Sequence, residues 1–256
     1  MRICKAIFST NRLEYLIPTL ESFHKNLDFG NHEVDGIFID DWPTGRNDGF
    51  IEALAKKYGY NRVVLHQENM GLTSTWQHLN ELLAEKEYDY IWHQEDDVEL
   101  LHPVKLDDML RLIQTDEFMC QVSLRRSSWY DSEIYNPIED SDILFENFRY
   151  NKRNEFFTPM ASLYPYWISQ VPFKRMFNIC PSEAVVMHTI NKMNDFKLYI
   201  ASIKQLNGDP FINHFGEISH GKRVNEGEPG WDFFKNFDPA KEYYSRSGIE
   251  FTQNKS

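Results

Sequence analysis

The chain has 256 residues and a formal net charge of −12, with 41% hydrophobic and 15% aromatic residues. This length and composition suit one large globular domain and exclude wholesale disorder. The negative charge argues against nucleic acid or an anionic membrane as the main partner. An anionic ligand would instead need a metal ion or a local group of basic residues to hold it.

Three cysteines, Cys4, Cys120 and Cys180, lie far apart in the chain and form no CxxC pair. This spacing favours thiols in a reducing compartment over a disulfide framework or a zinc site. No apolar run reaches transmembrane length, and the amino terminus lacks the long uncharged core of a signal peptide. We therefore expect a soluble, cytoplasmic protein with no transmembrane segment.

An apolar run over residues 2–10 predicts a first strand, and apolar positions at helical spacing over residues 13–27 predict the helix that follows. Asn11, three residues before Glu14, is a candidate amino-terminal cap for this helix. The order strand, polar turn, helix places the turn where open α/β sheets bind nucleotides. Arg12 in this turn could meet a phosphate or be an ordinary surface arginine.

Two more strands are predicted over residues 34–39 and 63–65, and a helical pattern follows each of them. The first of these strands ends in Asp40 and Asp41. The turn signal Asn69-Met-Gly71 precedes the second helix. This regular alternation predicts a parallel sheet with helices on both faces.

A fourth strand is predicted over residues 88–97, where an aromatic-rich apolar run ends in Glu95, Asp96 and Asp97. Three neighbouring carboxylates repel one another, and burying even one unpaired is costly, so a cationic group should lie over them. Oxygen ligands at a strand end suit Mg²⁺ or Mn²⁺, and such a metal would in turn hold a phosphate. The alternative is a strand that runs out into a solvated acidic turn.

The second half of the chain is less regular. Residues 128–154 are polar and show no clear period, so we expect a long loop there. The aromatic-rich residues 226–256 are expected to pack back over the domain, because so many exposed rings would promote aggregation. The other expected elements are a helix over residues 106–113, strands over residues 121–124 and 155–163, a helix capped by Ser182, and short apolar stretches over residues 198–203 and 210–212.

Four motifs, in this order, resemble those of glycosyltransferases of the GT-A fold, most closely the family-2-like group that uses nucleotide-diphospho-sugars. They are Phe8-Ser-Thr-Asn-Arg12, Asp40-Asp41, Asn69-Met-Gly71 and Glu95-Asp96-Asp97. The likeness covers residues 1–125 well and the rest loosely, through Glu183 and the stretch from His214. It implies an α/β, Rossmann-like fold with a central, mostly parallel sheet flanked by helices. It also implies a catalytic domain over residues 1–225, with a nucleotide-sugar-binding half (1–125) and an acceptor-side half (126–225).

The resemblance implies binding roles in the first half. The residues that would line the base and ribose pocket are Thr10, Asn11 and Arg12. Asp40 or Asp41 would accept a hydrogen bond from the pyrimidine edge, a turn or helix-start role being the alternative. Asn69 and Gly71 would let the backbone approach the nucleotide.

Glu95, Asp96 and Asp97 stand where the family has its Asp-x-Asp signature. By resemblance Asp97 would be the direct metal ligand, and Glu95 or Asp96 would hold the ribose or a metal-bound water. The glutamate in first position departs from the commonest pattern, which weakens the assignment of Glu95 more than that of Asp97. His214 lies where several members bring a late histidine to the metal or the diphosphate, with His220 as the close alternative.

Inverting members use an acceptor-side carboxylate to deprotonate the incoming hydroxyl while the nucleoside diphosphate leaves. Glu183 is the candidate base, since a helix start stabilises a carboxylate, although a capping role alone would explain the same position. Glu155 and Asp195 are its rivals. Candidate diphosphate contacts, with solvated surface positions as the alternative, are Arg125, Arg126, Lys222 and Arg223.

The expected function is therefore an inverting glycosyltransferase that uses Mn²⁺ or Mg²⁺. It would move a sugar from a UDP- or GDP-sugar to a hydroxyl of a glycan or other acceptor. A nucleotidyltransferase is one alternative, but residues 9–12 lack the glycine that usually marks that class. A carbohydrate-binding protein without turnover is the other. Aromatic side chains that could stack on sugar rings in either case are Trp129, Tyr130, Tyr164, Tyr166 and Trp167.

Overall fold

The computed structural model describes residues 1–126, 143–153, 161–170, 198–214, 218–219 and 222–223. Its first half alternates strands and helices as the sequence predicts. The elements are β1 (Arg2–Ser9), α1 (Leu13–Asn26), β2 (Leu27–Asp28), β3 (Glu33–Asp40), α2 (Asp48–Lys57), β4 (Arg62–Leu65), α3 (Leu72–Leu83) and β5 (Tyr90–Glu95). None of the helices that the structure describes is long and apolar enough to cross a membrane.

The described part of the second half adds mainly strands. They are β6 (Val98–Leu100), β7 (Val104–Lys105), β8 (Met119–Leu124), β9 (Ile143–Phe145), β10 (Phe148–Arg153), β11 (Ser162–Pro165), β12 (Tyr199–Gln205), β13 (Ile212–His214), β14 (Ile218–Ser219) and β15 (Lys222–Arg223). Two helices accompany them, α4 (Leu106–Ile113) and the short α6 (Tyr166–Ile168). The predicted helix over residues 106–113 is confirmed.

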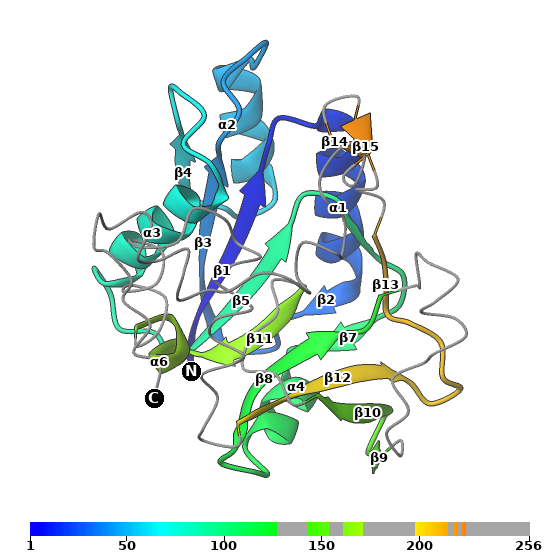
Figure 1. The fold of residues 1–256 in the computed structure, drawn as a ribbon. Coiled ribbons are helices and arrows are strands. Elements are labelled where there is room, and N and C mark those ends of the chain that lie inside the picture. Colours follow the sequence, from blue (N-terminus) through cyan, green and yellow to red (C-terminus); the bar gives the residue numbers. More distant parts are fainter. Residues whose placement is uncertain (127–142, 154–160, 171–197, 215–217, 220–221, 224–256) are drawn as a thin grey trace, which may run out of the picture.

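One nine-stranded sheet joins the two halves in the order β4-β3-β1-β5-β11-β8-β12-β10-β9. In Figure 1 it runs from β4 at the upper left to β9 at the lower right. Strands β4, β3, β1 and β5 are mutually parallel, whereas β11 lies antiparallel between β5 and β8. The mixed, mostly parallel sheet with flanking helices confirms the predicted fold class.

Alternate side chains of β1 pack on opposite faces of the sheet, as the pleat of a strand requires. Ile7 packs with buried residues of α1 and α2 in one core cluster. Phe8 packs on the other face against Trp76 of α3, with ring centroids 4.8 Å apart. Helices α1 and α2 therefore cover one face of the parallel half and α3 covers the other (Figure 1).

A close approach explains the glycine within β3. A Cβ atom at Gly36 would lie 2.1 Å from the carbonyl oxygen of Gly59 and 2.6 Å from the Cα of Tyr60. Since these contacts are with backbone atoms, a side chain at Gly36 would push the turn after α2 away from the sheet. Glycine therefore allows the chain to return directly into β4.

The structure corrects three boundaries. Helix α1 has Arg12 as its N-cap residue, not Asn11, which has a φ of 57°. Asp40 Oδ2 accepts from the backbone N–H of Asn11, so the chain turns there before the helix begins. The predicted strand over residues 88–97 ends at Glu95.

The third correction is in the predicted loop. The expected loop over residues 128–154 contains β9 and β10. β10 pairs with β12, and that distant partner explains why the local pattern showed no strand. Residues 155–160, the start of the next expected strand (155–163), lie outside the described residues, and β11 begins at Ser162.

Candidate metal and nucleotide site

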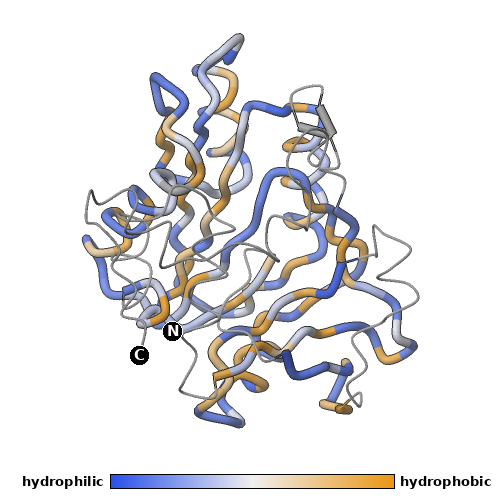
Figure 2. Tube along the Cα trace, viewed as in Figure 1, coloured by the Kyte–Doolittle hydropathy of each residue, from blue (hydrophilic) through white to orange (hydrophobic). Residues whose placement is uncertain are grey.

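Three polar segments meet at the carboxyl edge of the parallel strands. The register pairs Ser9 of β1 with Asp40 of β3, and Phe8 with Glu95 of β5. The turn after β1, the acids after β3 and the acids after β5 are therefore neighbours in space. Figure 2 shows that the end of β5 and the turn after it are hydrophilic. This edge is where parallel α/β sheets bind their ligands.

Asp96 is buried at this edge, with a relative exposure of 2%. Its carboxylate accepts from the backbone N–H of Thr10 at 2.8 Å and pairs with the guanidinium of Arg12. Burial, reinforced by the charge of Asp97 and opposed by that of Arg12, raises the pKa of Asp96 to about 6. Its backbone carbonyl accepts from Thr19 Oγ1 of α1 at 2.8 Å, which fixes the acidic turn against the helix.

Arg12 is a cation that pairs with two of the three adjacent acids, Asp96 and Asp97. Its Nη2 bonds to Asp96 and lies 2.9 Å from Asp97 Oδ2. The residue is 9% exposed, so it is not an ordinary surface arginine. The alternative of a solvated acidic turn is also excluded, because both aspartates are buried.

Glu95, Asp97 and His214 form a cluster in which one ligand atom from each lies within 4.8 Å of the others. His214 Nε2 lies 3.0 Å from Asp97 Oδ1 and 3.9 Å from Glu95 Oε2. β13 brings the histidine there by pairing antiparallel with β6, with His214 opposite Val98. Burial alone would raise the pKa of Asp97, but the hydrogen bond and charge of His214, together with Arg12, lower it below its ordinary value.

The donor set of this cluster fits a divalent cation. Two carboxylates and an imidazole offer one nitrogen and several oxygen ligands. Mg²⁺ favours oxygen ligands and keeps much of its water, whereas a mixed oxygen and nitrogen set is better suited to Mn²⁺. Arg12 holds the other carboxylate oxygen of Asp97, so the oxygen that faces His214 keeps a fixed direction.

Asp40 and Asp41 bind loop backbone and basic side chains. Asp40 accepts from the N–H groups of Asn11 and Trp42 and from Arg46 Nη1, at 2.8, 3.1 and 2.9 Å. Asp41 accepts from the N–H groups of Met70 and Gly71 at 2.8 and 2.7 Å, and its Oδ1 lies 2.7 Å from His66 Nδ1. These contacts correspond to the turn role; reading of a nucleotide base by either acid stays a prediction.

Other predicted binding residues that the structure describes are Asn69, Gly71, Arg125 and Arg126. Asn69 Oδ1 accepts from the N–H of Gly71 at 3.0 Å, and Gly71 has a φ of 78° directly before α3. Arg126 forms a backbone bridge with Ile212, two residues before His214. Arg125 Nη1 lies 3.4 Å from Asn151 Oδ1 of β10.

Several candidates cannot be placed. The predicted base and its rivals, the alternative histidine and two of the aromatic residues lie outside the described residues: Glu183, Glu155, Asp195, His220, Trp129 and Tyr130.

Lys222 and Arg223 form β15, which pairs with β14. Tyr164 is fully buried in the core beneath α3, so it cannot stack on a sugar. Trp167 is 44% exposed and could do so.

Sequence reasoning missed three residues that organise this edge. The Arg46 side chain is 1% exposed and binds Asp40 and the carbonyl of His66. Thr19 joins α1 to the acidic turn, and His66 joins Asp41 to His78 of α3. The one hint was Thr19, a polar residue beside the apolar stripe of its helix. Arg46 and His66 lie in polar segments where their distant partners left no local pattern.

No family model matches the chain, and no curated protein matches its sequence. Its fold does match solved structures. S. aureus TarS 1–349 in complex with UDP gives a TM-score of 0.52 at 13% identity, covering 83% of this chain and 60% of that chain. The complex with UDP-GlcNAc gives 0.52 at 13% identity, covering 94% and 69%. The chain has the GT-A fold.

At this identity the likeness concerns the fold alone. A third S. aureus TarS structure gives a TM-score of 0.52 at 13% identity, and the match covers 94% of this chain. The chain spans 60% of TarS 1–349 in its UDP complex and 41% of this third TarS chain.

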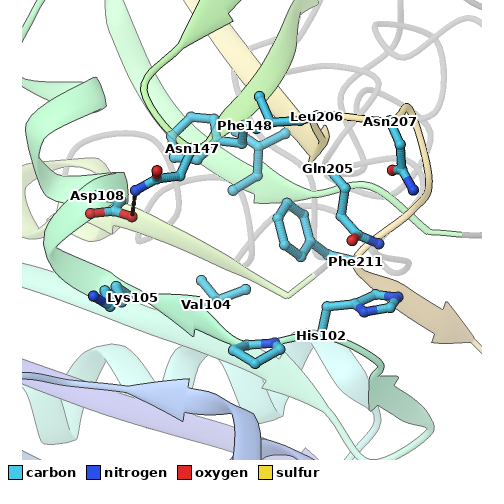
Figure 3. A pocket seen from close by; sticks show the side chains of 12 residues that line it. His102, Val104, Lys105, Asp108, Asn147, Phe148, Gln205, Leu206, Asn207 and Phe211 are labelled. Atoms are coloured by element: carbon cyan, nitrogen blue, oxygen red, sulfur yellow. Dashed lines mark hydrogen bonds between the residues drawn. The ribbon is translucent and has the colours of Figure 1, made fainter.

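The structure also has a separate cavity, whose lining includes none of Glu95, Asp97 and His214. It has a volume of about 350 Å³ and is shown in Figure 3, with Phe148 and Phe211 among its lining side chains. Its polar groups bond to their own neighbours: Asn147 Nδ2 donates to Asp108 Oδ2 at 3.1 Å, and Gln205 Nε2 to the carbonyl of Pro210 at 3.3 Å. None of the predicted site residues that the structure describes lines it.

Proposed function

We propose that the protein is a metal-dependent glycosyltransferase. It moves a sugar from a UDP- or GDP-sugar to a hydroxyl group of a glycan or other acceptor. The observation that carries this proposal is the convergence of Glu95, Asp97 and His214 at the carboxyl edge of a GT-A sheet. The complexes of TarS with UDP and with UDP-GlcNAc support the choice of a nucleotide-sugar donor.

The three clustered side chains would hold the ion, preferably Mn²⁺. A divalent ion in this place would neutralise the negative charge that develops on the departing diphosphate. Arg12 contributes in a different way, because its bonds to Asp96 and Asp97 keep both carboxylates oriented without an ion. In a protein with a net charge of −12, such local compensation is needed before two phosphates can approach.

The nucleotide would lie between the loops that Asp40 and Asp41 hold. Asp40 ties down Asn11 in the turn after β1, and Asp41 ties down Gly71 in the turn before α3. Because the two aspartates hold both turns in place, the backbone of these turns and the side chains of Thr10, Asn11 and Asn69 would line the base and ribose pocket. Rigid loops of this kind position a ligand at a low entropic cost.

The acceptor hydroxyl would lose its proton to a carboxylate as its oxygen bonds to the anomeric carbon, on the face opposite the departing nucleoside diphosphate. This single displacement would invert the configuration at that carbon. Glu183 is the proposed base. The variant Glu183→Gln tests it: turnover should fall by at least about 100-fold while nucleotide affinity is retained. Unchanged turnover would reject this residue and direct attention to Glu155 and Asp195.

Calorimetry with UDP and GDP, with and without Mn²⁺, tests the metal-dependent site. The wild-type protein should bind one of these nucleotides with an affinity that Mn²⁺ raises, and Asp97→Asn should remove the metal dependence. Glu99→Gln is the matched control, because Glu99 is a carboxylate on β6 that lies outside the cluster. Nucleotide binding that ignores Mn²⁺ in the wild type, or equal metal dependence in Asp97→Asn, would contradict the proposal.

Product analysis with a panel of nucleotide-sugars then separates the classes of activity. A glycosyltransferase releases UDP or GDP. A nucleotidyltransferase, supplied with a sugar phosphate and a nucleoside triphosphate, releases pyrophosphate instead. A carbohydrate-binding protein releases neither and shows no metal-dependent nucleotide affinity.

A further inference from the structure

Lys5 is a cation that lies under α1, and none of the described residues gives it an anionic partner. Its Nζ donates to the carbonyl of Tyr58 at 2.7 Å and lies 4.5 Å from the centre of the Tyr60 ring. Among the residues that the structure describes, no carboxylate is within ion-pairing distance of it, and burial alone lowers its pKa to about 8. An ammonium group has three N–H donors, and among the described residues one oxygen, the carbonyl of Tyr58, accepts from it.

Gln94 is a second donor without an acceptor. The residue is 1% exposed, and its Oε1 accepts from Trp92 Nε1 at 2.8 Å. The indole nitrogen can only donate, so this bond fixes which end of the amide faces Trp92. The Nε2 group at the other end is buried and has no hydrogen-bond partner among the described residues. A buried donor without an acceptor destabilises the fold unless a ligand or water satisfies it.

Both donors line one small cavity. Its volume is about 80 Å³, which is more room than a single water molecule needs. The remaining lining is the ring of His24 together with apolar and aromatic side chains, and no acidic residue contributes. These other residues are Leu20, Phe23, Leu27, Phe29, Tyr58 and Tyr60.

We propose that this cavity binds a small monovalent anion, a halide or a short carboxylate, between Lys5 Nζ and Gln94 Nε2. Each donor then gains the acceptor that the described residues do not provide. The apolar walls exclude large hydrated anions, and the cavity is too small for a nucleotide. None of its lining residues belongs to the Glu95–Asp97–His214 cluster, so the inference does not depend on the proposed function.

Thermal unfolding of the full chain at pH 7 and constant ionic strength tests this site. Sodium gluconate, whose anion is too bulky for the cavity, is replaced stepwise by chloride, bromide or acetate. A ligand that binds only the folded state raises the unfolding midpoint, by about 3–5 °C once its concentration is tenfold above Kd. A rise with chloride and bromide identifies a halide site, and a rise with acetate identifies a carboxylate site.

Two variants tie the response to the cavity. Gln94→Glu keeps an acceptor for Trp92 and places a carboxylate beside Lys5, so it should raise the midpoint in gluconate and remove the anion response. Lys5→Met should remove the response as well. Lys152→Met is the matched control: Lys152 lies 4.3 Å from the Tyr199 ring centre but has Asp116 at 3.6 Å, so its loss should leave the response intact.

The proposal is overturned if no anion raises the midpoint of the wild-type protein. It is equally overturned if the rise persists in both Gln94→Glu and Lys5→Met, because the anion would then act elsewhere on the molecule.

Discussion

The protein carries the same dipeptide, Asp-Asp, at the carboxyl ends of two parallel strands, β3 and β5, that flank β1, and the two copies are compensated differently. Asp40 ends β3 and Asp41 follows it; the pair accepts from four backbone N–H groups and also contacts the side chains of Arg46 and His66. Asp96 and Asp97 follow β5 and bind mainly side chains, those of Arg12 and His214. Both pairs are buried, so burial does not distinguish them.

The type of partner explains the difference in role. A backbone N–H group cannot leave without unfolding the loop to which it belongs, so the first pair is a structural tie. A histidine side chain can exchange a carboxylate for a metal ion with little movement. His66 contacts Asp41 as well, but among the described residues it is His214 that lies close to two carboxylates, those of Asp97 and Glu95. The second pair is therefore suited to binding, although the two dipeptides are identical in sequence.

The largest expected effect comes from removing the cation of the second pair. Arg12→Met leaves Asp96 and Asp97 buried without their guanidinium, which should lower the free energy of unfolding by about 3–5 kcal/mol. If the cluster binds Mn²⁺, the ion should restore part of this loss, because it replaces the missing positive charge. Urea unfolding with and without Mn²⁺ measures both effects.

Arg46→Met is the matched control for that experiment. The side chain of Arg46 is also buried, with an exposure of 1%, but it pairs with Asp40 in the first pair. Its loss should also destabilise the protein, and Mn²⁺ should not rescue it. Equal rescue of both variants would show that the ion acts away from the cluster and that the two pairs do not differ as described.

A smaller effect, of opposite sign, is expected at Lys5, a partly buried charge with no charged partner among the residues that the structure describes. Lys5 has a folded-state pKa of about 8, against an ordinary value of 10.5. Between these two pH values the unfolded chain binds the proton that the folded chain has released, so the Lys5 contribution to stability rises with pH. Below pH 8 the group is charged in both states, and the burial penalty, about 3 kcal/mol, is present in full.

Lys5→Met should therefore be more stable than the wild type at pH 7 in gluconate, and the difference should vanish as pH approaches 10.5. Urea unfolding of both proteins across this range measures the difference. A constant difference at all pH values would mean that the gain comes from packing and not from the removed charge.

The smallest effect tests the tie itself. Asp40→Asn keeps the shape of the side chain but removes the charge that Arg46 needs and turns an NH₂ group towards other donors. The expected loss is about 2 kcal/mol, with nucleotide binding weakened through the loop at Asn11. Asp48→Asn is the control. Asp48 is exposed to solvent and its Oδ1 lies 2.8 Å from Nε of the same arginine, so this substitution should change stability little. Equal losses would show that burial at Asp40 adds nothing.

The fold of the first hundred residues could be predicted because its information is local. Apolar runs of strand length alternate with helical spacing, and each element buries one face against its neighbour in sequence. Strands β9 and β10 could not be predicted in this way, since β10 owes its place to pairing with β12, about fifty residues later.

Part of the site could also be predicted from the sequence. Three adjacent acids at a strand end require positive charge, and that argument predicted a metal. The structure shows that Arg12 supplies the charge for Asp96 and part of that for Asp97. The convergence of His214 with these acids came from the resemblance to a family and not from any local pattern, because β13 reaches β6 from more than a hundred residues away.

By itself the sequence determined the strand and helix order of the first half, the carboxyl edge where the polar residues gather, and the need to compensate the acids there. Only the tertiary structure decided which cation pairs with which carboxylate. In the part of the chain that the structure describes, it also leaves Lys5 without a carboxylate and Gln94 Nε2 without an acceptor. The physical reason is that local pattern reports which groups are buried. The partner of a buried charge is chosen by strand register and helix packing, which join residues that are distant in the chain.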